Sequence, residues 1–234
     1  MNKRILIVGA GGLGVPAALA LARAGIRDFA MMDPDPVELS NLPRQIIFGE
    51  ASLGLTKVNA AADYFSHNYQ DASVEPLELL LDENNAEEII LRFGFVIDAT
   101  DSPAAKFLIN DTCVALGRPF VYGGVLGLSG QAMTVMPGRT ACLRCLFEEP
   151  PDEADAASCR DAGIIGPVAG AIGEVQAAEA LAWIHGRMPA LAGTMLTLDG
   201  SITGRMRPTF IAARAGCACG AAQPHASAEL SAAR

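Results

Sequence analysis

The run Ile5-Leu6-Ile7-Val8-Gly9-Ala10-Gly11-Gly12-Leu13-Gly14, followed by an alanine- and leucine-rich stretch, decides the fold of this chain. Four consecutive apolar residues predict a buried strand, the glycines predict a tight turn, and residues 12–24 predict a helix that ends at Gly25. A second strand-like run, residues 29–32, ends at Asp33. This order of strand, turn, helix and strand is a βαβ unit, which implies parallel strands joined by a right-handed crossover.

The rest of the chain continues this alternation and then changes near residue 123. The sequence therefore predicts an α/β fold: a Rossmann-like mixed sheet, parallel in its first half and partly antiparallel in its second half, flanked by helices. One domain is expected over residues 1–220, with a disordered tail over residues 221–234. The acidic, proline-rich stretch 148–155 is expected to be a mobile loop. Further helices are expected at 57–69, 85–92, 104–116 and 172–184, and strands at 74–79, 93–99, 119–122, 195–198 and 205–210, with strands and turns over 123–137.

Composition limits the classes of function. The chain has 234 residues, of which 51% are hydrophobic and 6% aromatic, and its formal net charge is -9. Bulk attraction to nucleic acid or to an anionic membrane is therefore not expected. No uninterrupted apolar stretch reaches the roughly 18 residues that a membrane-spanning helix needs. The first apolar run breaks at Gly9 into a glycine loop and does not resemble a signal peptide, so we expect a cytoplasmic protein.

The glycine loop predicts a phosphate-binding site. Gly9, Gly11 and Gly14 match the pattern G-x-G-x-x-G between a strand and a helix, where a tight turn lets the backbone approach a phosphate at the helix N-terminus. Asp33 ends the second strand, where a carboxylate can accept hydrogen bonds from ribose hydroxyls. These features alone favour NAD or FAD, because dinucleotide enzymes are the commonest owners of this pattern. Glycines that serve only a tight turn are the structural alternative.

Polar residues further along the chain argue against hydride transfer. Parallel strands deliver the residues at their carboxyl ends to one crevice, so Asp33 and Asp101 are expected to lie close together, joined by Asn41, Arg44 and Lys57 from loops. Two cations around a nucleotide suit phosphoryl chemistry, because they neutralise charge on a triphosphate, and a carboxylate can hold Mg²⁺. Hydride transfer needs neither, so the residues favour an ATP site.

Eight motifs in order, spread from the first strand to Gly220, resemble the ThiF/MoeB/HesA family, the bacterial relatives of ubiquitin-activating enzymes. A single motif would be weak evidence, whereas this series covers nearly the whole chain. The motifs are GAGGLG at 9–14, D-x-D-x-V-E-x-S-N-L-x-R-Q at 33–45, G-L-x-K at 54–57, D-A-T-D at 98–101, C-L-R-C at 142–145, C-R-D-A-G at 159–163, G-x-x-Q-A-x-E-A at 173–180 and C-A-C-G at 217–220.

The resemblance implies an activity. Enzymes of this family bind ATP and Mg²⁺ together with the C-terminal Gly-Gly tail of a ubiquitin-fold sulfur carrier protein such as ThiS or MoaD. The tail carboxylate attacks the α-phosphate to give an acyl-adenylate and pyrophosphate, and sulfur later replaces AMP to form a thiocarboxylate. By resemblance, Gly12 lies against the phosphates, Asp33 holds the ribose, and Asp101 binds magnesium. The full nucleotide site is expected to comprise Gly9, Gly11, Gly12, Gly14, Asp33, Asp35, Ser40, Asn41, Arg44, Lys57 and Asp101.

Six cysteines offer metal or thiol chemistry. Cys142 and Cys145 form C-x-x-C, and Cys217 and Cys219 form C-x-C. Four thiolates from two distant segments suit a closed, structural zinc site; reduced thiols or a redox pair are the alternatives. The family pattern has C-x-x-C in both halves, so the second pair here is one residue short. Cys159 lies where some members have a thiol that takes part in sulfur transfer, so it joins Arg44, Lys57 and Asp101 as a candidate catalytic residue. Cys113 is expected to pack in the core.

Several alternatives stay open from the sequence. Asp101 also suits the N-cap of the helix that begins near Pro103. By resemblance we expect a homodimer, with a sulfurtransferase as a further partner. Many family members carry a segment before the first strand that supplies an arginine to the partner subunit, and no counterpart is expected here. A related enzyme acting on a small molecule or a tRNA base, a nicotinamide-dependent oxidoreductase and a non-catalytic scaffold are the competing functions. The carrier and its pathway are not identified by the sequence.

Overall fold

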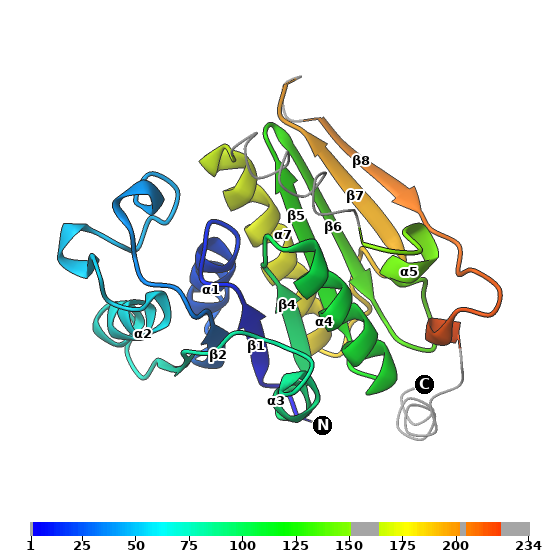
Figure 1. Cartoon of the computed structure of the whole chain (residues 1–234), viewed down its shortest axis with the longest axis horizontal. Helices are drawn as coiled ribbons and strands as arrows, with labels where there is room; N and C mark the ends of the chain where they lie inside the picture. Colours follow the sequence, from blue (N-terminus) through cyan, green and yellow to red (C-terminus); the bar gives the residue numbers. More distant parts are fainter. Residues whose placement is uncertain (1, 151–163, 202–204, 221–234) are drawn as a thin grey trace.

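A single eight-stranded mixed sheet forms the centre of the protein (Figure 1). The structure is a computed structural model, which describes residues 2–150, 164–201 and 205–220. The strand order is β3-β2-β1-β4-β5-β6-β7-β8. The strands are β1 (Ile5–Val8), β2 (Asp28–Met32), β3 (Ser73–Leu77), β4 (Phe95–Asp98), β5 (Phe120–Leu126), β6 (Ser129–Val135), β7 (Thr194–Asp199) and β8 (Arg205–Phe210).

The first five strands are parallel and the last three are antiparallel to their neighbours, as the sequence predicted. β1 lies between β2 and β4, and all of these pairs are parallel, with Ile5 opposite Phe29 on one side and Phe95 on the other. The strand order reverses at β1, so the loops after β1 and β4 open a crevice at the carboxyl ends of the strands. β5, β6, β7 and β8 then follow one another as antiparallel neighbours.

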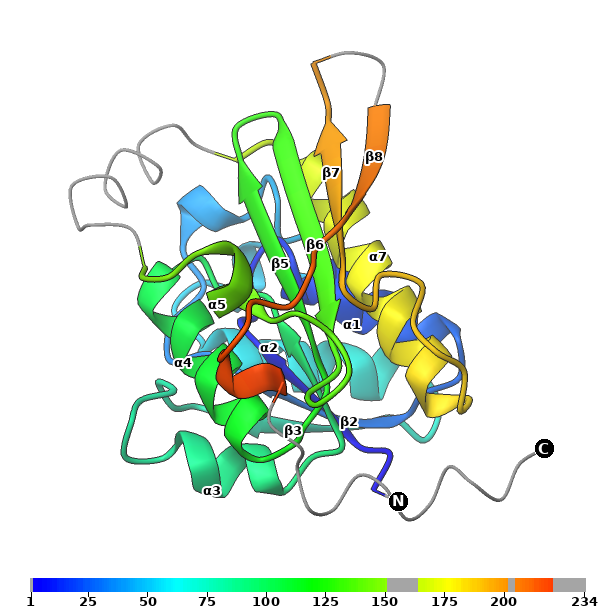
Figure 2. The same cartoon turned by 90° about the vertical axis from the view of Figure 1, so that its right-hand side faces the viewer.

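Helices cover both faces of the sheet. One apolar core joins α1 (Gly14–Arg23), α2 (Lys57–Asn68) and α7 (Gly166–Ile184) to the sheet, and a second core joins α3 (Ala86–Leu91), α4 (Pro103–Ala115) and α5 (Leu143–Leu146) to the other face. Figure 2 shows β5 and β6 between α7 on one side and α4 and α5 on the other. Strands buried on both faces explain why β1 reads as an unbroken apolar run rather than as an alternating one.

The expected elements are present, with shifted boundaries. α7 begins at Gly166, six residues before the predicted start, because Pro167 occupies its first turn, a position that proline favours. The four-residue helix α5 was not predicted from the sequence. Short 3₁₀ turns η1 (Leu39–Asn41), η2 (Glu50–Ser52) and η3 (Ala218–Gly220) lie in the irregular stretches. The predicted tail, 221–234, and most of the predicted loop at 148–155 lie outside the described residues.

Among the described residues, none of the helices combines the length and apolarity that crossing a membrane requires.

Candidate active site

A large cleft opens at the carboxyl ends of β1, β2 and β4 and continues across β5 and β6. Its volume is about 1260 Å³. One half is lined by the glycine loop, the turn after β2 and the turn after β4, while the other half is lined mainly by apolar residues of β5, α4 and α5. Nine of the eleven predicted nucleotide-site residues line this cleft, whereas Gly14 and Ser40 do not. The nine are Gly9, Gly11, Gly12, Asp33, Asp35, Asn41, Arg44, Lys57 and Asp101.

The glycine loop is shaped by close backbone contacts. Gly9 has φ +103°, and a Cβ there would lie 2.5 Å from the carbonyl oxygen of Ala99. A Cβ on Gly14 would lie 1.8 Å from the carbonyl oxygen of Gly9, so neither position can hold another residue without a backbone shift. Gly12 is different, because a Cβ there would meet only ordinary contacts at 3.6 Å or more, and Gly12 makes no hydrogen bond within the described chain. Its backbone N–H is therefore available to an anion at the start of α1.

The carboxylate of Asp33 organises the turn after β2. Its Oδ2 accepts a hydrogen bond from the Ala10 N–H at 2.8 Å, and its Oδ1 accepts one from the Asp35 N–H at 2.9 Å. The Lys57 Nζ lies 3.3 Å from Asp33 Oδ1 and 2.8 Å from Asp35 Oδ2. Lys57 and Asp33 are buried, whereas the Asp35 side chain is exposed. The glycine loop, β2 and the start of α2 are thus joined at one point beside the cleft.

Arg44 is a cation without a carboxylate partner in the described part of the chain. Its Nη1 donates to the Ser40 carbonyl oxygen at 2.8 Å, and no ion pair involves it. Its aliphatic stem passes within 3.7 Å of the place where a Cβ on Gly12 would lie. Asn41 is buried, and its Nδ2 donates to the Ser40 Oγ at 3.2 Å. The Arg44 side chain, which has no carboxylate partner among the described residues, therefore passes beside Gly12.

The two aspartates at the end of β4 have different environments. Asp98 is fully buried, and its Oδ1 accepts hydrogen bonds from the N–H and the Oγ1 of Thr100. Asp101 is exposed to the cleft and has no hydrogen bond or ion pair within the described residues. The alternative of Asp101 as the N-cap of α4 is wrong, because the Ser102 Oγ accepts from the Ala105 N–H and caps this helix. Its carboxylate is free for a hard cation such as Mg²⁺.

Three cleft residues carry chemistry that the sequence reasoning did not assign. Lys106 contacts Asp98 through its Nζ, which lies 5.0 Å from the ring centroid of Tyr122. Gln45 is 2% exposed, and its Oε1 has no hydrogen-bond partner, although it lies beside Gly11 in the nucleotide half. Gln45 directly follows Arg44 in the motif at 33–45, so the sequence could have indicated it as a site residue. Lys106 in a helix and Tyr122 in a strand belong to no motif, so nothing in the sequence indicated them.

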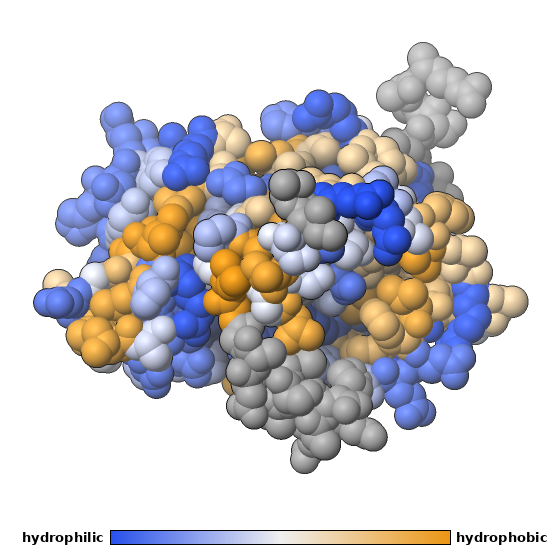
Figure 3. Space-filling view, turned by 90° about the horizontal axis from the view of Figure 1, so that it is seen from above, coloured by the Kyte–Doolittle hydropathy of each residue, from blue (hydrophilic) through white to orange (hydrophobic). Residues whose placement is uncertain are grey.

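The second half of the cleft is apolar. Phe107, Leu143 and Phe147 line it together with Leu126 and Ile164. Leu126, Phe147 and Ile164 are each about 40% exposed or more. Figure 3 looks onto the carboxyl-terminal edge of the parallel strands, where apolar patches alternate with hydrophilic ones. An elongated substrate with a small apolar or backbone-like end could lie along this half.

The four paired cysteines form one cluster between α5 and the segment at η3, on the face of the sheet covered by α4. Their sulfur atoms all lie within 4.8 Å of one another, and the set could hold a metal ion. The Cys142 and Cys217 sulfurs are 3.7 Å apart, and those of Cys145 and Cys219 are 3.4 Å apart. A tetrahedral zinc site with Zn–S bonds of about 2.3 Å requires sulfurs about 3.8 Å apart, so the residues fit zinc. The C-x-C spacing therefore brings both of its sulfurs to the cluster despite the missing residue.

The local environment gives the thiols of the cluster different pKa values. Burial, assisted by the Cys217 thiol, raises the pKa of Cys142 to about 11. Burial also acts to raise the pKa of Cys145, but the hydrogen bonds it accepts, led by the Arg214 N–H, outweigh this and lower that pKa to about 7. Cys113 is fully buried in the core, as predicted, and burial raises its pKa. The candidate catalytic Cys159 lies outside the described residues.

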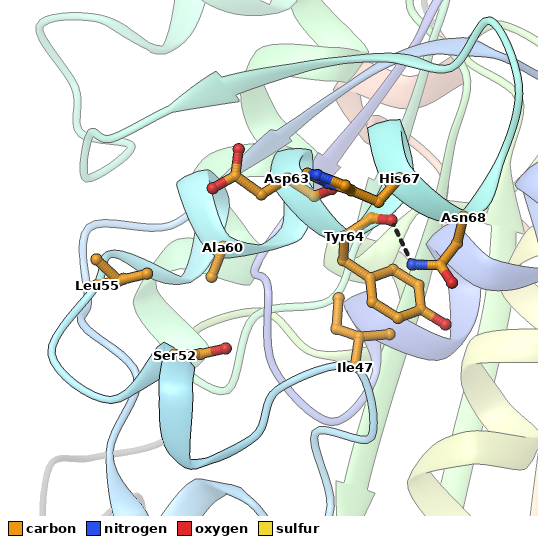
Figure 4. A pocket seen from close by; sticks show the side chains of 8 residues that line it. All are labelled: Ile47, Ser52, Leu55, Ala60, Asp63, Tyr64, His67 and Asn68. Carbon is orange, nitrogen blue, oxygen red and sulfur yellow. Dashed lines mark hydrogen bonds between the residues drawn. The ribbon is translucent and has the colours of Figure 1, made fainter.

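A smaller hollow lies between α2 and the irregular stretch before it (Figure 4). Its volume is about 280 Å³, and its lining includes Asp63, Tyr64 and His67. The His67 ring nitrogen Nδ1 is already bonded to the Asp63 carbonyl oxygen at 2.7 Å, and both side chains are exposed. We assign no function to this hollow.

The fold and the cleft define a Rossmann-like α/β protein with an anion-binding glycine loop at its topological switch point. The model of the ThiF family matches residues 1–219. The chain belongs to the ThiF family, as the sequence motifs predicted.

Known relatives agree with this assignment. The chain is 41% identical over 196 residues to "Adenylyltransferase and sulfurtransferase MOCS3" of Culex quinquefasciatus, covering 84% of this chain and 45% of that protein. It is 37% identical over 199 residues to "SAMP-activating enzyme E1" of Haloferax volcanii, covering 85% of this chain and 73% of that protein. The chain thus spans about half the length of the MOCS3 relatives that it matches.

Solved structures support the fold. The structure of E. coli MccB with ATP superposes with a TM-score of 0.81 and 20% sequence identity, covering 93% of this chain and 65% of that chain. A likeness at this identity concerns the fold alone. The mixed sheet with its parallel and antiparallel halves is confirmed.

Proposed function

We propose that this protein is an ATP-dependent adenylyltransferase that activates the C-terminal Gly-Gly carboxylate of a ubiquitin-fold sulfur carrier protein. Membership of the ThiF family and similarity to relatives named as an adenylyltransferase and an activating enzyme support this proposal. The observation that carries it is a set of polar groups along one cleft that are not paired with an oppositely charged side chain of the described residues. These are the N–H of Gly12, the guanidinium of Arg44 and the carboxylate of Asp101.

Each group has a role in the reaction. The carrier carboxylate forms a bond to the α-phosphorus of ATP, and the bond from that phosphorus to the bridging oxygen breaks, releasing pyrophosphate and leaving an acyl-adenylate. A carboxylate nucleophile needs no general base. Gly12 and Arg44 stabilise the phosphate charge, Asn41 and Ser40 hold the turn that carries Arg44, and Asp33 accepts the ribose hydroxyls. Gly9 and Gly14 shape the loop through their close backbone contacts, and Gly11 lies in it beside Gln45.

Lys57 and Asp35 form an ion pair at the edge of this site. The Lys57 Nζ is shared between Asp33 and Asp35, and the Asp35 side chain is exposed, so a triphosphate can compete for the ammonium group. Asp101 would hold Mg²⁺, which neutralises phosphate charge when it is bound. The four-cysteine cluster would hold zinc in a structural role, since all four positions around the metal are filled by protein.

The carrier tail would lie in the apolar half of the cleft, over β5. Tyr122, Gly124 and Phe107 line this half. A Gly-Gly end has no side chains and therefore needs less space beside these residues than any other pair of residues. Cys159 remains a predicted participant in sulfur transfer, and the homodimer and a sulfurtransferase partner also remain predictions.

Exchange of labelled pyrophosphate into ATP tests the proposal. We expect exchange with a carrier ending in Gly-Gly, none with the same carrier lacking those two residues, and none for Asp101→Ala, whose fold is unchanged by circular dichroism. If the protein binds ATP but shows no exchange with any Gly-Gly carrier from several pathways, carrier activation is disproved. Exchange retained by Asp101→Ala would disprove the magnesium assignment.

A further inference from the structure

A buried ion pair lies at the boundary between the two halves of the cleft. Asp98, at the end of β4, is 0% exposed, and Lys106, in the first turns of α4, has a side chain that is 12% exposed. The Lys106 Nζ lies 3.3 Å from Asp98 Oδ1 and 3.4 Å from Asp98 Oδ2. The proposed reaction gives no chemical role to either residue.

The lysine is committed to this pair and to a neighbouring carbonyl. Its Nζ also donates to the carbonyl oxygen of Gly123 in β5 and lies over the ring of Tyr122. Its charge is balanced by Asp98, and its donors point to protein groups. Arg44, in contrast, has no carboxylate partner in the described chain. Lys106 is therefore unsuited to bind a phosphate directly.

The aspartate is committed in the same way. Its Oδ1 accepts from the Thr100 N–H at 3.1 Å and from the Thr100 Oγ1 at 2.7 Å. Thr100 precedes Asp101, and Ser102 after it is fixed as the cap of α4. The turn that carries the exposed Asp101 is thus fixed on both sides. On one side Thr100 is hydrogen-bonded to the carboxylate of Asp98, and on the other side Ser102 caps α4.

The same pair fixes the strand on the far side of the cleft. The carbonyl of Gly123 is held by Lys106, and Gly124 next to it lines the apolar half. From the opposite face of the sheet, Gln176 of α7 donates through its Nε2 to the carbonyl oxygens of Asp98 at 2.6 Å and of Val121 at 3.3 Å. β4, α4, β5 and α7 therefore meet around Asp98.

We propose that Asp98 and Lys106 form a positioning pair, which sets the carboxylate of Asp101 relative to the strand edge at Gly123 where the second substrate lies. Neither residue touches substrate. This inference rests on the proposed function, because it takes Asp101 as the magnesium-binding acid. Its consequence is specific: loosening the pair weakens the response to Mg²⁺ while leaving the glycine loop, Asp33 and Arg44 able to bind nucleotide.

The test measures ATP binding by calorimetry, with and without Mg²⁺, and needs no carrier. Lys106→Met alone leaves a buried unpaired charge, which can unfold the protein, so the main variant is Asp98→Asn with Lys106→Met, where both charges are removed. We expect this folded double variant to bind ATP without Mg²⁺ within about threefold of wild type. The factor by which Mg²⁺ tightens binding should fall about tenfold or more. Lys106→Arg, which keeps the cation, should retain that factor.

A matched control lies away from the cleft. Arg92 pairs with Glu75 and stacks over Phe93, so Arg92→Met removes a similar combination of ion pair and cation–π contact. We expect the control to keep the wild-type response to Mg²⁺. A double variant with the wild-type response, an equal loss in the control, or a wild-type protein that does not respond to Mg²⁺ would each overturn the positioning role. Absence of carrier-dependent exchange in the wild type would instead refute the proposed function, and the binding result would still be readable.

Discussion

Removing the proposed zinc from the four-cysteine cluster should lower the free energy of unfolding by an amount set by the length of chain between the cysteine pairs. The cluster joins α5 to the segment at η3, and Cys142 and Cys217 are 75 residues apart in sequence. A cross-link that closes a loop of this length removes about 4.5 kcal/mol of chain entropy from the unfolded state in the loop-closure description. For a domain of this size, 1 kcal/mol corresponds to roughly 2–4 °C, so metal removal should lower Tm by roughly 9–18 °C.

The assay is thermal unfolding before and after treatment with a chelator, together with the zinc content of the purified protein. We expect about one zinc per chain and a Tm that falls on chelation and recovers when zinc is restored. Cys217→Ser should show the lower Tm at the outset and no further response to chelator. Cys113→Ala is the matched control, because Cys113 is also buried but lies outside the cluster. It should lose some packing energy and keep the full response.

The reasoning fails if zinc is present at one per chain and its removal leaves Tm unchanged. In that case the loop between the two cysteine pairs would already be held by other contacts, and the metal would add nothing to the fold. It also fails if the purified protein has no zinc and does not bind it, while its four thiols react as ordinary free cysteines.

Three further substitutions test the nucleotide site and the stability of the fold. Gly12→Ala should fold with a stability within about 0.5 kcal/mol of wild type, since its Cβ meets no close contact, yet lose ATP affinity at least about tenfold in calorimetry because the methyl group crowds the loop and the Arg44 side chain beside the proposed phosphate site. Gln45→Leu should stabilise the free protein by about 1 kcal/mol in urea unfolding, because the unpartnered Oε1 disappears, and should weaken ATP binding; unchanged affinity would show that the nucleotide ignores this amide. Glu179→Ala should cost about 3 kcal/mol or more by the same measurement, as its carboxylate accepts from Thr134 and from two backbone N–H groups; a small loss would mean that water replaces it.

The fold was predictable because the sequence states it locally. The apolar runs of β1 and β4 and the glycine turn give strand, turn and helix without knowledge of distant contacts, and the rule that crossovers are right-handed supplies the parallel arrangement. The antiparallel half was less defined, because residues 123–137 alternate only weakly and contain glycines such as Gly130, which accommodates Ile172 of α7. The helix α5 was missed because four residues show no periodicity.

The residues of the site could be predicted from their motifs, but the ion pairs and hydrogen bonds between them could not. Sequence order placed Asp33, Arg44, Lys57 and Asp101 in one crevice, and all four line the cleft. The sequence could not tell that Lys57 is held by two carboxylates while Arg44 has none, because both residues read as cations in loops. That difference arises from the meeting of β2 and α2, which is a tertiary contact.

The run Asp98-Ala99-Thr100-Asp101 shows why such pairings decide function. Its two aspartates are chemically identical and three residues apart, so a local pattern does not show which groups either side chain contacts. Burial makes the distinction: inside the sheet an unpaired carboxylate is costly, so Asp98 requires Lys106 and Thr100, whereas Asp101 in the cleft requires no partner. The buried acid thereby holds the turn on which the free acid is presented. Lys106 balances the charge of Asp98 and so keeps it as the residue that fixes this turn, and the proposed magnesium role of Asp101 depends on that turn.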